Sequence, residues 1–280
     1  MSAKIEIERR LRAEEYKRIS KILFNKSFDD LSNDEYIEIL KIADRYGSKY
    51  KRFYKLKPDT DIRTITSNLI EQVYTPHFTT HVSLKIINLI KTVNSFTIYS
   101  EFYTEDDILV DIEIDGETYK KKQSVFFRRI MLLEKKANSN YLIISIDPTG
   151  DGSSVYKKLE ENISSLSSII NLNINSYFDI IKVDDGIHKL ILEDKIVPTK
   201  VLGIDESTKR VKSVCAGVKD NLKDDDIYSS CKDKVLELEN MKLKFDKEGI
   251  ELFKDTLLKI STRASQGVTD ELTNLLIPIL

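Results

Sequence analysis

The sequence predicts an α+β protein with a small helical N-terminal domain, residues 1–95, followed by a mixed domain, residues 96–280, rich in antiparallel β-hairpins with closing helices. Apolar residues recur with helical spacing as far as Asn94. Near Ser95 the apolar period changes from about 3.6 residues to about 2. Asp-Gly pairs then separate alternating runs, which is a strong hairpin signal because both turn residues need positive φ. These observations define the predicted fold class.

Four segments of the N-terminal domain have helical periodicity. They span about 4–24, 32–47, 60–74 and 80–94. The second begins with a capping box, in which Ser32 and Glu35 each pair with a backbone N–H that the first turn leaves free. Gly47 is expected to end this helix, and Pro76 the third.

The second domain is predicted as hairpins, helices and connecting strands. A strand is predicted at 96–103, and the predicted hairpins pair 108–114 with 117–122, 178–183 with 187–192, and 200–204 with 210–216. The segment 125–134 fits a strand or a helix. Further strands are expected at 141–146 and 235–245, a charged loop at 219–234, and helices at 153–171, 249–261 and 269–280.

Composition limits the classes of function. The chain is 41% hydrophobic and 32% charged, which predicts a packed core inside a charged shell. A formal net charge of −2 excludes a uniformly basic surface that would coat nucleic acid. No apolar run approaches the roughly 18–20 residues of a membrane span, so no membrane partner is expected.

The cysteines predict a reducing compartment. Cys215 and Cys231 provide neither a disulfide framework nor the paired spacing of a zinc site. Charged residues interrupt the first apolar runs, so we expect no signal peptide and a cytoplasmic location.

One segment, residues 45–57, mixes cations with aromatic rings and has no acidic residue. Cations neutralise phosphates, and aromatic rings offer stacking faces to unpaired bases. We name it the basic-aromatic segment. Its predicted nucleic-acid-binding residues are Arg45, Lys49, Tyr50, Lys51, Arg52, Phe53, Tyr54, Lys55 and Lys57. The alternative is a connector whose rings anchor it to the core, and in either case we expect its cations to face solvent.

A second candidate lies between a predicted buried strand and a helix. Asp147 and Asp151 flank Pro148, Thr149 and Gly150 there, and two carboxylates could hold Mg²⁺. The same residues are also ordinary in turns and helix caps. The segment lacks the Gly-Lys-Ser/Thr ending of a phosphate-binding P-loop.

A third candidate is formed by Asp185, Glu193 and Lys195. An aspartate on one strand and Glu-x-Lys on the next resembles the local arrangement of restriction-endonuclease-like nucleases. That resemblance implies a metal held by the carboxylates and a lysine that positions water. It covers about a dozen residues, the spacing from Asp185 to Glu193 is short, and Asp185 falls in the predicted turn. A charged hairpin end is the alternative.

The histidines offer a weaker metal candidate. His77 and His81 stand four apart, as on a zinc-binding helix face, but no neighbouring Cys or Glu completes a ligand set.

Two functions remain open at this point. The first is an accessory or regulatory binding protein that contacts nucleic acid or a partner protein through the basic-aromatic segment. The second is a metal-dependent nuclease or phosphoryl-transfer enzyme, the one case in which Mg²⁺ would be a cofactor. A homo-oligomer fits either function. Convergence of the acids and Lys195 in one cleft would favour the enzyme.

Overall fold

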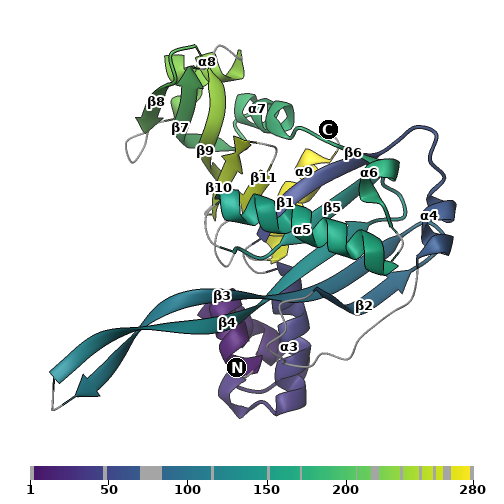
Figure 1. Cartoon of the computed structure of the whole chain (residues 1–280), viewed down its shortest axis with the longest axis vertical. Helices are drawn as coiled ribbons and strands as arrows, with labels where there is room; N and C mark the ends of the chain where they lie inside the picture. Colours follow the sequence, from purple (N-terminus) through teal and green to yellow (C-terminus); the bar gives the residue numbers. More distant parts are fainter. Residues whose placement is uncertain are drawn as a thin grey trace.

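The computed structural model describes most of the chain (Figure 1). The described residues are 3–46, 49–69, 84–114, 117–149, 152–170, 172–205, 207–215, 221–233, 236–245, 248–254, 257–260 and 266–277.

A single antiparallel sheet organises these residues, since all of its described strand pairs are antiparallel. Its strand order is β2-β3-β4-β5-β1-β11-β10-β9-β7-β8, and β6 pairs with β1 beside that path. The strands are β1 (Lys49–Leu56), β2 (Lys85–Lys91), β3 (Phe96–Ile114), β4 (Glu117–Lys135), β5 (Tyr141–Ile146), β6 (Phe178–Ile180), β7 (Val197–Asp205), β8 (Arg210–Cys215), β9 (Glu237–Phe245), β10 (Glu248–Phe253) and β11 (Leu257–Ile260).

The helices lie at the chain start and on the two faces of the sheet. They are α1 (Ala3–Arg10), α2 (Ala13–Phe24), α3 (Asn33–Tyr46), α4 (Ile62–Asn68), α5 (Gly152–Ile170), α6 (Ile174–Tyr177), α7 (Asp184–Leu192), α8 (Asp226–Lys232) and α9 (Gln266–Leu276), with 3-10 turns at Phe28–Asp30 and Leu222–Asp224. None of the described helices is long and apolar enough to cross a membrane.

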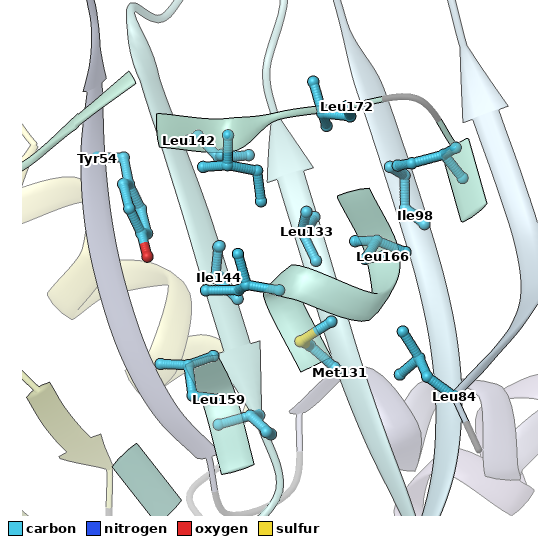
Figure 2. Packing of buried hydrophobic residues seen from close by; sticks show 14 of the residues in the cluster. Tyr54, Leu84, Ile98, Met131, Leu133, Leu142, Ile144, Leu159, Leu166 and Leu172 are labelled. Carbon is cyan, nitrogen blue, oxygen red and sulfur yellow. The ribbon is translucent and has the colours of Figure 1, made fainter. Parts of the chain in front are cut away.

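The first core lies between α5 and one face of the sheet. Leu159 and Leu166 of α5 face Ile98, Leu133 and Ile144 of the strands (Figure 2). We call this side of the sheet the α5 face.

Two further cores complete the packing. On the opposite face, Phe53 and Ile143 pack with residues of α7 and α9 and with the strands β7, β9, β10 and β11. The third core, which includes Ile7, Leu11 and Ile39, joins the N-terminal helices to one another.

Several sequence predictions are confirmed. The backbone N–H of Ser32 donates to Glu35 Oε2 over 2.8 Å, and the Glu35 N–H donates to Ser32 Oγ over 3.4 Å, as a capping box requires. The hairpin around residues 115–116 is present, because Ile114 pairs with Glu117, although the turn residues lie outside the described residues. Residues 125–134, which fitted either structure, belong to β4. The hairpin of β7 with β8 and the helix α5 also match their predictions.

The predicted hairpin at 178–192 is wrong. Its first half is only the three-residue β6, and its second half is α7. Val183, Ile187, Leu190 and Ile191 are all buried, and their spacing is that of one helical stripe. Asp184 and Asp185 occupy the first turn, where the helix dipole favours acidic residues. The helical period and the acidic first turn therefore outweigh the Asp-Gly turn signal.

Other elements also differ from prediction. The expected helix at 4–24 is interrupted, so α1 ends at Arg10 and α2 begins at Ala13. Described residues of the expected helix at 80–94 form β2, and those at 249–261 form β10 and β11. These segments form strands because each pairs with a neighbouring strand, which supplies backbone hydrogen-bond partners. Sequence periodicity does not reveal such partners.

The helical part of residues 1–95 is thus smaller than expected. Both β1 and β2 belong to the large sheet, so the described N-terminal helical unit is limited to Ala3–Tyr46, followed later by the short α4.

Candidate functional site

The basic-aromatic segment is mostly the central strand β1. It pairs with β5 on one side and with β11 and β6 on the other. Lys49 and Arg52 are each 1% exposed, and Tyr50, Lys51, Phe53 and Tyr54 are also buried. The expectation that its cations face solvent is therefore wrong for Lys49, Lys51 and Arg52. Burial is tolerated because each of these cations contacts polar or acidic groups from elsewhere in the chain.

Asp147 is the centre of a buried charge cluster behind β1. Its carboxylate pairs with Lys49, and Arg10 Nη1 lies 2.8 Å from Asp147 Oδ2. The backbone N–H of Ile130 donates to the same Oδ2 over 2.8 Å. One carboxylate thus connects the first helix, the central strand and β4.

The cluster extends along the seam between the N-terminal helices and the sheet. Arg128 donates to both carboxylate oxygens of Asp44 over 2.9 and 3.0 Å, and to Glu101 Oε2 over 2.9 Å. Arg10 Nε lies 3.2 Å from Glu6 Oε2. The buried charge cluster comprises Glu6, Arg10, Asp44, Lys49, Glu101, Arg128 and Asp147.

Burial and pairing shift the pKa values of this cluster. Burial raises the pKa of Asp147, but the neighbouring Arg10 and Lys49 outweigh that effect and hold it well below its usual value. Burial lowers the pKa of Lys49, although Asp147 opposes the change. The cluster therefore keeps Asp147 ionised at neutral pH. Its carboxylate already pairs with Arg10 and Lys49, the positions that a bound metal ion would otherwise take.

Lys51 and Arg52 point to opposite faces of β1. Lys51 Nζ donates to Ser145 Oγ over 3.2 Å, and burial lowers the pKa of Lys51 to about 8. Arg52 pairs with Glu160 and stacks over the Tyr156 ring at 4.6 Å. A Ser–Lys pair occurs in some hydrolases. Here Ser145 is 2% exposed in mid-strand, which withholds its hydroxyl from a substrate.

The remaining cations of the segment are closer to solvent. Arg45 lies 2.7 Å from Glu134, and Lys57 donates to the carbonyl of Asn175 over 2.8 Å. Lys55 is exposed and lies 5.8 Å from the Tyr141 ring centroid. The segment consequently presents no continuous row of cations and rings. Its predicted contact with nucleic acid stays a prediction that this geometry does not favour.

The predicted catalytic residues do not converge. Asp185 lies in the first turn of α7, whereas Glu193 follows its last turn, about 12 Å further along the helix axis. Lys195 Nζ pairs with Glu193 Oε2 at 2.8 Å near the surface. Asp147 is in the buried charge cluster, and Asp151 lies outside the described residues. Among described side chains, no group of three or more metal-ligating residues is present.

The described histidine and the two cysteines form no metal site or disulfide in the described chain. His188 Nδ1 lies 2.9 Å from the hydroxyl of Tyr228, and both are buried. Cys231 is buried and Cys215 exposed, and neither forms a disulfide. The predicted pair His77 and His81 lies outside the described residues.

A shallow cleft brings Lys55 and Asp185 to the same surface. It encloses about 610 Å³, and Asp179 and Lys182 also line it. The volume is within the range of ligand sites, about 300–1,000 Å³. All four charged side chains are exposed, however, and they sum to no net charge. The charges of the cleft are therefore balanced and open to solvent.

The β3–β4 hairpin continues far beyond its neighbours. β2 pairs with β3 only as far as Glu101, and β5 pairs with β4 only from Met131. The rest extends away from the body as a twisted two-stranded ribbon (Figure 1). We call residues 105–114 and 117–126 the arm. Its ten paired rows project roughly 30 Å.

One face of the arm is apolar. It continues the α5 face, because Ile98 and Phe102 of the first core alternate along β3 in the same phase as Ile108, Val110 and Ile112. On β4 the same side carries Tyr119 opposite Ile112 and Val125 opposite Asp106, while the polar Lys121 and Gln123 lie opposite Val110 and Ile108. The arm's apolar face consists of Ile108, Val110, Ile112, Tyr119 and Val125. Tyr119 is 48% exposed, and no member of this face belongs to any of the three cores of the described chain.

The other face of the arm carries acidic and basic residues together with the exposed Leu109 and Phe126. Acidic residues of β3 oppose lysines of β4, and Lys122 Nζ lies 2.6 Å from Asp107 Oδ2. Asp111 is directly opposite Lys120. A cross-strand pair of opposite charges contributes about 0.2–1 kcal/mol.

A polar collar separates the arm's apolar face from the first core. Arg129 Nη2 donates to Asp106 Oδ2 over 2.6 Å, and Arg129 Nε donates to Thr104 Oγ1 over 3.0 Å. The apolar face beyond this collar is therefore a separate surface.

Sequence reasoning identified the arm's strands but missed their use as a surface. The alternation of Val110 and Ile112 with Asp111 and Glu113 indicates a strand with one buried face. The missing information was which element covers that face, and in the described chain none does. Neither the models of known protein families nor the curated proteins yield a match to this sequence.

Proposed function

We propose that this protein is a binding protein that contacts a partner protein through the arm's apolar face. The supporting observation is the amphipathic ribbon, whose apolar side continues the α5 face beyond the helices that cover the body. Two-stranded ribbons are marginally stable in water, and contiguous exposed apolar surface marks interaction sites. A partner would supply the second layer that this face lacks.

The other candidate sites support the same choice. Burial of Lys49, Lys51 and Arg52 leaves only three of the six cations of the predicted nucleic-acid contact near the surface. Asp185 and Glu193 lie at opposite ends of α7, so they do not meet in one cleft as the nuclease hypothesis requires. We therefore assign the proposed binding function to the arm and not to the basic-aromatic segment.

Site-specific photo-crosslinking in cells that produce the protein tests this proposal. A benzophenone amino acid replaces Val110 on the arm's apolar face, and a matched variant carries it at Asp111, the next residue on the charged face. We expect protein adducts from position 110 and few from position 111, because neighbouring strand residues point to opposite sides. Equal yields at both positions, or no adduct from position 110, would contradict it. Thermal melts of both variants confirm that the fold is retained.

A further inference from the structure

We propose that the partner on the arm's apolar face is the arm of a second copy of this chain, packed face to face and antiparallel. The two-fold axis lies between the two ribbons and runs parallel to the Ile112–Tyr119 pair, directly above it. This inference rests on the proposed function, since it identifies the protein that the arm contacts. The argument comes from the order of side chains on β4 and from the placement of the body.

The apolar side of β4 has a self-complementary charge pattern. Glu117, Tyr119 and Lys121 share this side, because alternate residues of a strand point the same way. Glu117 and Lys121 flank Tyr119 at equal spacings of about 7 Å. A half-turn about this axis therefore brings Lys121 of each copy opposite Glu117 of the other. The interface would contain two reciprocal ion pairs.

The centre of the same arrangement is apolar. Ile112 is directly opposite Tyr119 in the ribbon, so the side chains of both residues adjoin the axis. Val110 adjoins Ile112 on the same face. Apolar side chains at the centre with charged pairs around them are the usual layout of a protein interface. The Tyr119 hydroxyl donates to Glu117 Oε2 over 2.9 Å, which leaves the second carboxylate oxygen for a lysine.

Three other symmetric arrangements place like charges together. An axis above Val110 and Lys121 would set Lys121 against its own copy. Edge-to-edge pairing of β3 with β3 would align Asp107, Asp111 and their acidic neighbours, and pairing of β4 with β4 would align lysines. Like charges directly opposite one another destabilise a sheet contact. Among these arrangements, the charges favour the antiparallel face-to-face packing about the Ile112–Tyr119 pair.

The body of the molecule favours the same choice. On the α5 face of the sheet, α5 already occupies the layer next to the strands (Figure 1). Packed layers lie about 10 Å apart, so a two-fold axis parallel to the strands would place both bodies at the same end and set α5 against its copy. Antiparallel arms place the two bodies at opposite ends.

Only the outer halves of two ribbons meet in this arrangement. We expect a buried area below about 1,200 Å², which corresponds to a weak, transient dimer.

The test is a charge exchange followed by sedimentation equilibrium of the full chain at low salt. Lys121→Glu and Glu117→Lys should each weaken self-association about tenfold, because two attractive pairs become two repulsive ones. A one-to-one mixture of these variants should recover association, as should the double variant. Lys120→Glu, with the same charge change on the charged face, is the matched control and should associate like the unmodified chain.

Two results would overturn this inference. One is a chain that stays monomeric at the highest concentration reached; the other is equal weakening by Lys121→Glu and Lys120→Glu. Photo-crosslinks from position 110 separate this failure from that of the proposed function. An adduct with a different protein retains the arm as an interface and excludes the second copy, whereas no adduct removes both.

Discussion

Strand β1 and the arm distribute charge and apolar surface in opposite ways. In β1, three cations are buried in the middle of the sheet. In the arm, isoleucine, valine and tyrosine side chains line a face that no described element covers. The difference shows that partners, and not polarity alone, determine where a side chain can lie.

Each region is consistent with this rule. Asp147 and Glu160 supply the charges that make Lys49 and Arg52 tolerable inside the sheet. The arm's apolar residues lack an equivalent partner among the residues that the structure describes. We therefore expect the free energy of unfolding to fall strongly when the acidic partner of a buried β1 cation is removed. Substitution of an apolar arm residue should change it little in the free protein.

Asp147→Asn should give the largest effect. Loss of this carboxylate leaves Lys49 and Arg10 without their shared counter-charge in a buried site, which costs about 3–5 kcal/mol of unfolding free energy. Urea unfolding at neutral pH measures it. Asp29→Asn is the control, because Asp29 pairs with Lys4 at the surface and should leave the midpoint unchanged. Equal midpoints for the unmodified chain and Asp147→Asn would refute the structural role of the cluster.

Acidification should reduce the difference between those two proteins. The folded pKa of Asp147 lies below its unfolded value, so its contribution is complete above the unfolded pKa, about 4, and is lost as the pH falls toward the folded one. The urea midpoints of the unmodified chain and Asp147→Asn should approach each other below about pH 4. A constant separation down to the lowest pH at which both fold would contradict the assigned pKa direction.

Lys51→Met should change how stability depends on alkaline pH. Burial lowers the pKa of Lys51 to about 8 in the folded chain, below its unfolded value of about 10.4. Between these values the unfolded chain binds more protons, so rising pH stabilises the fold, by up to about 3 kcal/mol over the whole window. Urea midpoints from pH 7.5 to about 9.5 should rise less in Lys51→Met than in the unmodified chain. Parallel profiles would exclude Lys51 as the titrating group.

Val110→Ser should have the smallest effect on stability. A half-buried valine on a projecting ribbon contributes little to the fold, so we expect a change within about 0.5 kcal/mol. The same urea titration measures it at low protein concentration, where the arm is free. A loss comparable to that of a core valine would show that the arm packs on its own body.

Local signals predicted part of this fold well. The Ser32–Glu35 capping box begins α3 at the expected place, and the alternation around residues 115–116 identifies the β3–β4 hairpin. Both depend on residues close together in the sequence. They require no knowledge of what packs against them.

Long-range partners explain the failures. Lys49 and Asp147 are distant in the sequence, so nothing near the basic-aromatic segment shows that an acid neutralises it. The residues around Asp185 contain both a turn signal and a helical stripe, and packing of Ile187 and Leu190 in the second core decides between them. The arm's alternation indicates a covered face, but a cover in another molecule leaves no trace in this sequence.

The position of β1 also has a consequence for how the chain assembles during synthesis. This early strand pairs with β11, about 210 residues later in the sequence, as well as with β5. At about 5–20 residues per second, β1 waits on the order of 10–40 s on the ribosome before its last neighbour emerges. During that interval Lys49 and Arg52 keep an unfinished strand hydrophilic. We therefore expect the charges that are buried in the finished sheet to disfavour aggregation through the open edge of β1 while the chain is incomplete.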